Sequence, residues 1–157
     1  MGKTTTKPTD DHTLAAYGAL LLRLSLGAMF LAHGLVLKVL TYGLPGTARC
    51  FASAGLPGWL AYATAAAETV GGVLLLLGVQ SRWVALALSP VLLGAIASVH
   101  GAKGWVFTAP GGGWEYPAYL FVLCVAQALL GDGAHALSRS VLPRGLPRRA
   151  AMSPAAR

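Results

Sequence analysis

The fold is decided by residues 58–99, which read GWLAYATAAAETVGGVLLLLGVQSRWVALALSPVLLGAIASV. This stretch holds two apolar runs, about 58–79 and 83–99, and each is long enough to cross a bilayer as a helix. The connection between them is only a few residues long, around Gln80 and Arg82. Because so short a connection cannot span the membrane, the two runs are predicted to form an antiparallel helical hairpin.

Two further apolar runs, about 14–40 and 114–130, flank the hairpin. The chain has 157 residues, of which 55% are hydrophobic and 11% are charged, and this is too apolar for a soluble domain. We therefore predict an all-α membrane protein, an antiparallel bundle of four transmembrane helices within residues 14–138. A polar segment, 1–13, precedes the bundle, and a basic tail, 139–157, is predicted to be disordered.

The basic residues predict the orientation of this bundle. In a four-span arrangement, eight Lys and Arg residues fall on the side of the two termini, and three fall on the other side. The positive-inside rule then places both termini in the cytoplasm. The net charge of +7 does not predict a nucleic-acid partner, because the basic residues are not interleaved with aromatic ones along a helix. The eight are Lys3, Lys7, Arg82, Arg139, Arg144, Arg148, Arg149 and Arg157, and the three are Lys38, Arg49 and Lys103.

Local signals predict where the helices begin, bend and end. Thr13 is expected to cap the first helix, and Gly43 with Pro45 to stop it. The segment from there to Pro57 is expected to be a loop along the membrane interface. Pro90 lies inside the third apolar run and is expected to bend it.

Three ionisable residues, Arg23, His33 and Glu68, lie inside apolar runs. A charge at the bilayer centre costs roughly 2.5–3.5 kcal/mol on insertion scales, so such residues are paired, neutral or functional. Glu68 belongs to a stripe of small residues at helical spacing, which predicts that it faces the bundle. His33 and Glu68 lean toward a common depth. We therefore predict that they share a proton, as a catalytic relay for a quinone or an ion.

Other polar residues are predicted to lie around this pair. His100 ends the third run, and Glu115 and Tyr116 open the fourth, so they are expected to form an outer rim that binds a ligand. Arg23 is expected to anchor the inner side or to contact a lipid phosphate. Packing hydrogen bonds for His33 and Glu68, and solvated loop ends for the rim, are the alternative interpretations.

Resident cofactors receive little support from the residues alone. His33 and His100 lie on different runs and raise haem ligation, but their depths differ and no CxxCH motif is present. Neither a metal-ligand spacing nor a nucleotide-binding glycine motif occurs in the sequence. Haem and a metal site are therefore not predicted.

Three segments together resemble the DoxX family of small bacterial membrane proteins. They are LLRLSLGAMFLAHGLVLKV (21–39), AAAETVGGVLLLLGVQSRWVAL (65–86) and the region from His100 to Arg139 that contains GGGWEYPAYL. The resemblance extends over about residues 17–139. Where the family often has Ser-x-Asp after the last helix, this chain reads Ser138-Arg139-Ser140.

The resemblance implies a multi-pass protein of the bacterial cytoplasmic membrane that is a quinone-interacting subunit of an oxidoreductase complex, with a protein partner that carries the redox chemistry. Motif positions of the family fall on Arg23, His33, Lys38, Glu68, Glu115 and Tyr116, among others. Lys38 thereby joins Arg23, His100, Glu115 and Tyr116 as an expected quinone or ligand contact.

Two alternative functions remain open at this point. The chain could be a non-enzymatic scaffold or assembly protein whose buried polar residues only set helix register. It could also be a small permease, which would require a homo-oligomer because four helices enclose little space for an aqueous path. The lipid bilayer is the expected partner in every case.

Overall fold

The computed structural model describes the backbone of residues 8–141 and the side chains of residues 10–141. This part of the chain is helical, and its one extended pairing is an isolated bridge between Val79 and Ser138. The predicted all-α class is therefore confirmed. The elements are α1 (Pro8–Leu31), the π-helix η1 (Ala32–Thr41), α2 (Leu44–Ser53), α3 (Trp59–Leu77), α4 (Ser81–Ala95), the π-helix η2 (Ile96–His100), the 3₁₀-helix η3 (Gly101–Lys103) and α5 (Glu115–Leu130).

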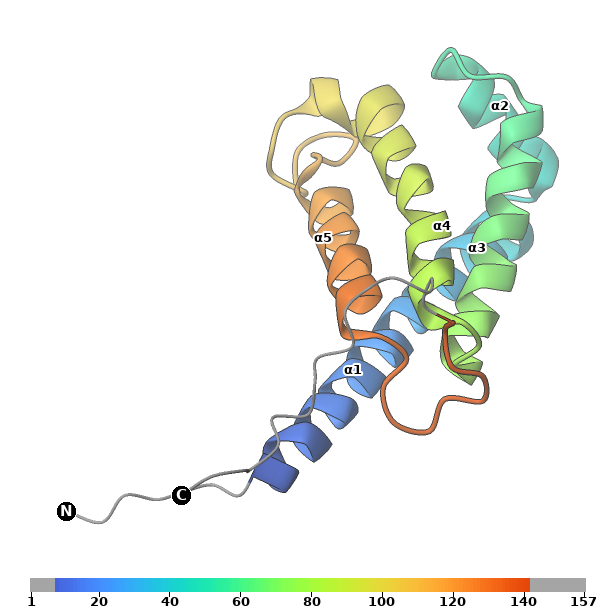
Figure 1. Ribbon diagram of the computed structural model, residues 1–157. Helices are drawn as coiled ribbons and strands as arrows, with labels where there is room; N and C mark the ends of the chain where they lie inside the picture. Colours follow the sequence, from blue (N-terminus) through green and yellow to red (C-terminus); the bar gives the residue numbers. More distant parts are fainter. Residues whose placement is uncertain (1–7, 142–157) are drawn as a thin grey trace, which may run out of the picture.

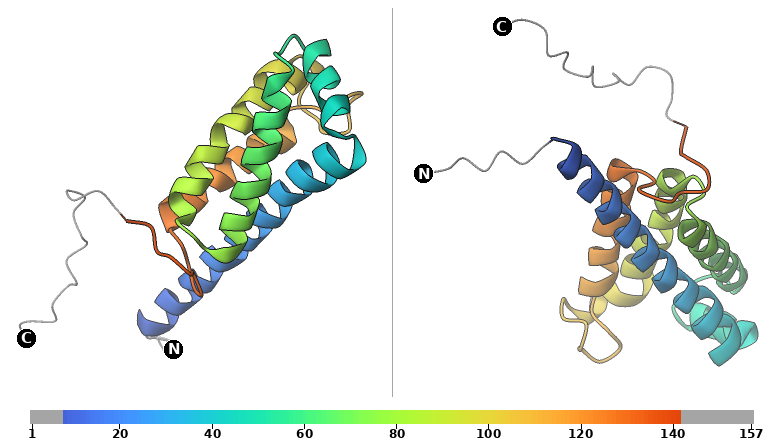
Figure 2. Two further views of the ribbon diagram at one scale, coloured as in Figure 1. Left: turned by 90° about the vertical axis from the view of Figure 1, so that its right-hand side faces the viewer. Right: turned by 90° about the horizontal axis from the view of Figure 1, so that it is seen from below.

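The long helices form a bundle with two distinct ends (Figures 1 and 2). The predicted hairpin is confirmed, because α3 and α4 are packed neighbours joined by a tight turn, while α1 packs along α3 and α5 along α4. The first turns of α1 and residues 131–141 lie at one end, which we call the terminal end. α2 and the connection 101–114 lie at the opposite end, which we call the α2 end.

Three stretches of helix are long and apolar enough to cross a membrane: Asp10–Thr41, Trp59–Leu77 and Ser81–Lys103. They establish a multi-pass membrane protein. α5 is apolar too, but its 16 residues extend only about 24 Å, less than the roughly 30 Å thickness of a hydrocarbon core. The fourth span and the cytoplasmic location of the termini stay predictions, and most of the predicted basic tail lies outside the described residues.

Two predicted boundaries are wrong. α1 begins at Pro8 and not near Thr13, since proline suits the first helical turn and the acids of that turn suit its partial positive charge. The expected interfacial loop contains α2, which starts directly after Gly43 and has Pro45 in its first turn. The predicted stop is confirmed, because η1 ends at Thr41 and Gly43 turns the chain with φ of 70°. α4 continues through Pro90, and the bend expected there stays a prediction.

Small residues set the distance between α1 and α3. A Cβ atom on Gly72 would lie 2.8 Å from the backbone nitrogen of Leu31, so the two backbones are nearly in contact there. On the side of this crossing that faces the terminal end, Leu26 and Phe30 of α1 pack with residues of α3, α4 and α5 in the apolar core. The other buried members of this core are Leu75, Ala85, Leu88, Leu92, Leu120 and Cys124.

Candidate functional site

An ion pair joins η1 to α3 near the α2 end of the bundle. The ammonium group of Lys38 donates a hydrogen bond to Oε2 of Glu68. The two side chains are 18% and 6% exposed, respectively. Because a lone charge at this position would carry a large desolvation cost, the two opposite charges compensate each other in the bundle.

The predicted burial of Glu68 is confirmed. It lies with Ala61, Ala65 and Gly72 on the buried face of α3, as the stripe of small residues predicts. Gly34 of η1 packs directly against this face, and a Cβ atom there would lie 2.8 Å from Cβ of Glu68. The close approach of the two helices is what brings Lys38 within reach of the carboxylate.

The π-helical geometry of η1 also helps to form this pair. Backbone hydrogen bonds in a π-helix join residues five apart, as in the bond from Tyr42 N to Leu37 O (2.9 Å). Residues His33 and Lys38 are five apart, so both lie on nearly the same side of η1. In an α-helix the same two residues would point about 140° apart. Short π segments are frequent at functional sites, and this one carries two of the predicted site residues.

His33 is held in one orientation by its backbone and ring contacts. Its Nδ1 atom lies 3.0 Å from the carbonyl oxygen of Met29, and its ring stacks on Tyr116 of α5 with centroids 6.2 Å apart. A carbonyl oxygen can only accept, so Nδ1 carries the hydrogen. In the neutral form of the ring, this tautomer leaves Nε2 as the acceptor nitrogen.

Two of the three predicted rim residues hold the connection 101–114 in place. His100 Nδ1 donates to the carbonyl oxygen of Gly112 (2.8 Å), and the backbone N–H of Phe107 donates to Oε2 of Glu115 (3.1 Å). Each contact ties the loop to a helix that flanks it. The structure thus gives His100 and Glu115 a loop-holding role and leaves their predicted ligand contacts untested.

The pairing predicted for Glu68 differs from the observed one. We predicted a proton shared with His33, but the Glu68 carboxylate bonds Lys38 and the His33 ring bonds Met29. The sequence-based estimate compared depth only, and depth does not specify which side of the helix a residue occupies. Lys38 and His33 nevertheless lie on the same helix, η1, and the His33 ring stacks on Tyr116. Arg23 lies apart from them, near the terminal end.

Residues 131–141 form a strap across the terminal end. Arg23 donates from Nη1 to the carbonyl oxygen of Asp132 (2.8 Å) and from Nη2 to that of Ala134 (3.3 Å). The backbone of Gln80 donates to Ser138 O (3.0 Å). The strap therefore ties α1 to the α3–α4 turn. Arg23 is 1% exposed and is held by the carbonyl oxygens of the strap, and its contact with a quinone or a lipid phosphate stays a prediction.

Asp132 is the centre of the strap and was missed in the sequence analysis. Its Oδ1 accepts from the N–H of Ser81 (2.8 Å) and the hydroxyl of Ser140 (2.7 Å), and its Oδ2 accepts from the N–H of Ser140 (2.7 Å). Burial by itself would raise the pKa of Asp132, but the bonds from Ser140 and Ser81 outweigh it and hold that pKa below its ordinary value. The only signal in the sequence is the acid within GDG after the last run, where a C-terminal turn is expected.

The family model for DoxX matches residues 18–101, which is more than half of the chain. The chain belongs to the DoxX family. The DoxX match includes η1 and α3, and so the ion pair, whereas α5 and the strap lie outside it.

A relative of this DoxX protein is the Bacillus subtilis (strain 168) protein whose name is "Putative oxidoreductase CatD". The two are 43% identical over 115 residues, which cover 73% of this chain and 80% of the relative. No solved structure matches the chain. Within the described residues, no group of three or more His, Cys, Asp or Glu side chains is placed to hold a metal ion.

Proposed function

We propose that this DoxX protein is an integral membrane subunit of an oxidoreductase complex, and that the cluster around η1 binds a quinone headgroup. The observation that carries the proposal is the Lys38–Glu68 ion pair with the His33 imidazole on the same side of η1. Membership of the family and the printed name of the B. subtilis relative support an oxidoreductase association. The proposed location is the bacterial cytoplasmic membrane.

The residues of the cluster suit a quinone headgroup. Quinone reduction takes up two electrons and two protons, and quinol oxidation releases them. The Lys38 ammonium can donate a hydrogen bond to a quinone oxygen, and Nε2 of His33 can accept one from a quinol hydroxyl. Glu68 would hold or accept a proton beside them. The electrons would pass to or from a partner subunit that carries a redox group.

Bound quinone is the direct test of this proposal. The protein is purified in mild detergent and extracted with organic solvent, and quinone is measured per protomer. Near-stoichiometric quinone is expected in the wild type and in Asp11→Asn, a control that removes an exposed carboxylate. It should be lost in Glu68→Gln of verified folding. Absence of quinone from all three proteins, or equal amounts in all three, would contradict the proposal.

A second candidate function is a scaffold or assembly protein of such a complex. It is favoured by the mutual satisfaction of Lys38 and Glu68, since a closed ion pair between two helices also sets their register. In that case Glu68→Gln would lower the amount of folded protein but leave the activity of the complex per folded molecule unchanged. A permease remains the third candidate, and it predicts flux in proteoliposomes that disappears with Glu68→Ala.

A further inference from the structure

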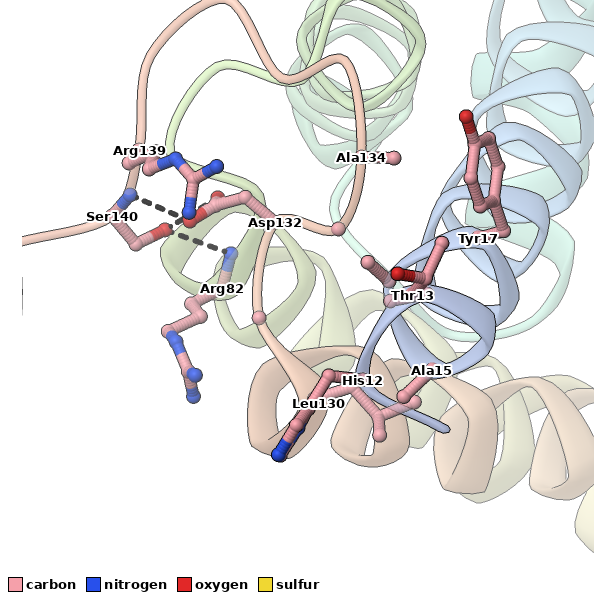
Figure 3. A pocket seen from close by; sticks show the side chains of 14 residues that line it. His12, Thr13, Ala15, Tyr17, Arg82, Leu130, Asp132, Ala134, Arg139 and Ser140 are labelled. Atoms are coloured by element: carbon pink, nitrogen blue, oxygen red, sulfur yellow. Dashed lines mark hydrogen bonds between the residues drawn. The ribbon is translucent and has the colours of Figure 1, made fainter. Parts of the chain in front are cut away.

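An open hollow of about 710 Å³ is lined by residues of the terminal end, whereas the ion pair joins η1 to α3. Its walls come from the first turns of α1, the last residue of α5, the start of α4 and the strap. Figure 3 shows Arg82 and Arg139 on one side of it and Tyr17 of α1 on the other. The hollow is therefore built from three separate segments of the chain.

The charge of the hollow favours an anion. Arg82 uses Nη1 for the carbonyl oxygens of Ala128 and Leu129, and Nε and Nη2 of this guanidinium have no hydrogen-bond partner within the described residues. The guanidinium of Arg139 likewise has none in residues 10–141. Asp132 also lines the hollow, but no ion pair joins its carboxylate to either arginine within the described residues, and its oxygens accept hydrogen bonds from Ser81 and Ser140.

The surroundings of the hollow favour a lipid as the source of that anion. α3 ends at Leu77, α4 begins at Ser81 and α5 ends at Leu130, so this is the level at which the apolar helices stop. Apolar side chains beside it are strongly exposed, as for Leu14 (69%) and Leu129 (75%). A molecule that carries a phosphate and acyl chains would match both the cations and this apolar surface.

We propose that this hollow binds the phosphate of an anionic phospholipid, with the guanidinium groups of Arg82 and Arg139 as its partners and the acyl chains on the exposed leucines. The site is independent of the quinone cluster at the other end of the bundle. The proposed site gives the terminal end a specific lipid contact, in addition to the general attraction between its basic residues and anionic lipids.

The test uses the full chain, delipidated in a neutral detergent, with lipid binding measured by native mass spectrometry. The probes are phosphatidylglycerol, phosphatidylcholine and inorganic phosphate. Arg139→Gln is the test variant, because its side chain is exposed and holds no described contact. Arg49→Gln is the matched control, since Arg49 is an exposed arginine of α2 at the opposite end.

We expect phosphatidylglycerol to bind more tightly than phosphatidylcholine, and Arg139→Gln to weaken its binding about fivefold. Arg49→Gln should leave binding unchanged, and inorganic phosphate should not compete at the lipid's concentration. Equal loss in both variants would show non-specific attraction and overturn the proposal. So would equal binding of the two lipids, or competition by phosphate at that concentration, which would indicate a soluble anion instead.

Discussion

Neutralising Glu68 while leaving Lys38 in place should destabilise the bundle strongly. Removing one partner of a buried ion pair costs about 3–5 kcal/mol, because the remaining charge stays desolvated. The Lys38 side chain keeps 18% exposure and can move toward the end of the bundle, so Glu68→Gln is expected near the lower limit, about 3 kcal/mol. Lys38→Met leaves the carboxylate of Glu68, which is only 6% exposed, and should cost at least as much.

The double variant separates the energy of the ion pair from the effect of changing each side chain on its own. Lys38→Met with Glu68→Gln leaves no buried charge, so most of the lost stability should return and the coupling energy should exceed about 2 kcal/mol. The free energy of unfolding is measured in mixed detergent micelles for the wild type, both single variants and the double variant.

A matched cycle controls for general effects of removing charge. Arg49→Met and Glu115→Gln change one cation and one acid that form no ion pair in the described structure. Their coupling should fall within about 0.5 kcal/mol of zero. A coupling energy just as small for Lys38 and Glu68 would refute the reasoning, because it would mean that each charge is solvated without the other.

Three further predictions concern the helix crossing and the strap. Gly34→Ala places a Cβ atom 2.7 Å from the backbone nitrogen of Thr69, and should lower the free energy of unfolding by about 1–3 kcal/mol in the same micelle assay. Gly78→Ala combines a φ of 72° with a clash against Nη1 of Arg23, so its melting temperature should fall well below that of Gly94→Ala, whose Cβ meets open space. Because the pKa of Asp132 is lower when folded, its contribution to stability is complete above the ordinary value of 3.8 and is lost as the pH falls through the folded value. Unfolding measured against pH should show this loss in the wild type and not in Asp132→Asn.

The sequence predicted much of the fold because its signals are local. Apolar runs of membrane-spanning length mark the helices, and the short connection at Gln80 requires the α3–α4 hairpin. The start of α1 and the presence of α2 were mispredicted because the local signal used was hydropathy. Both segments are polar or glycine-containing, so hydropathy does not distinguish a helix from a loop in them.

The candidate site was predicted only in part. Glu68 is buried as the small-residue stripe indicates, and Arg23 lies buried as an anchor. The partner of Glu68 was assigned to His33 because only the depths of the two residues were compared, and not the sides of the helix that they occupy. A change to π-helical hydrogen bonding between Ala32 and Thr41 leaves no mark in the pattern of apolar residues.

The sequence by itself determined that this chain is a helical membrane protein, where its long helices run, and that Glu68 cannot face lipid unpaired. These properties depend on the free energy of transferring side chains from water to hydrocarbon. That free energy is set by the residues of each segment alone. Only the tertiary structure decided that Lys38 neutralises Glu68, and that Asp132 joins Ser81 to Ser140. Those contacts link segments far apart in the chain, and they depend on how closely Gly34 lets two helices approach and on where the strap crosses the bundle.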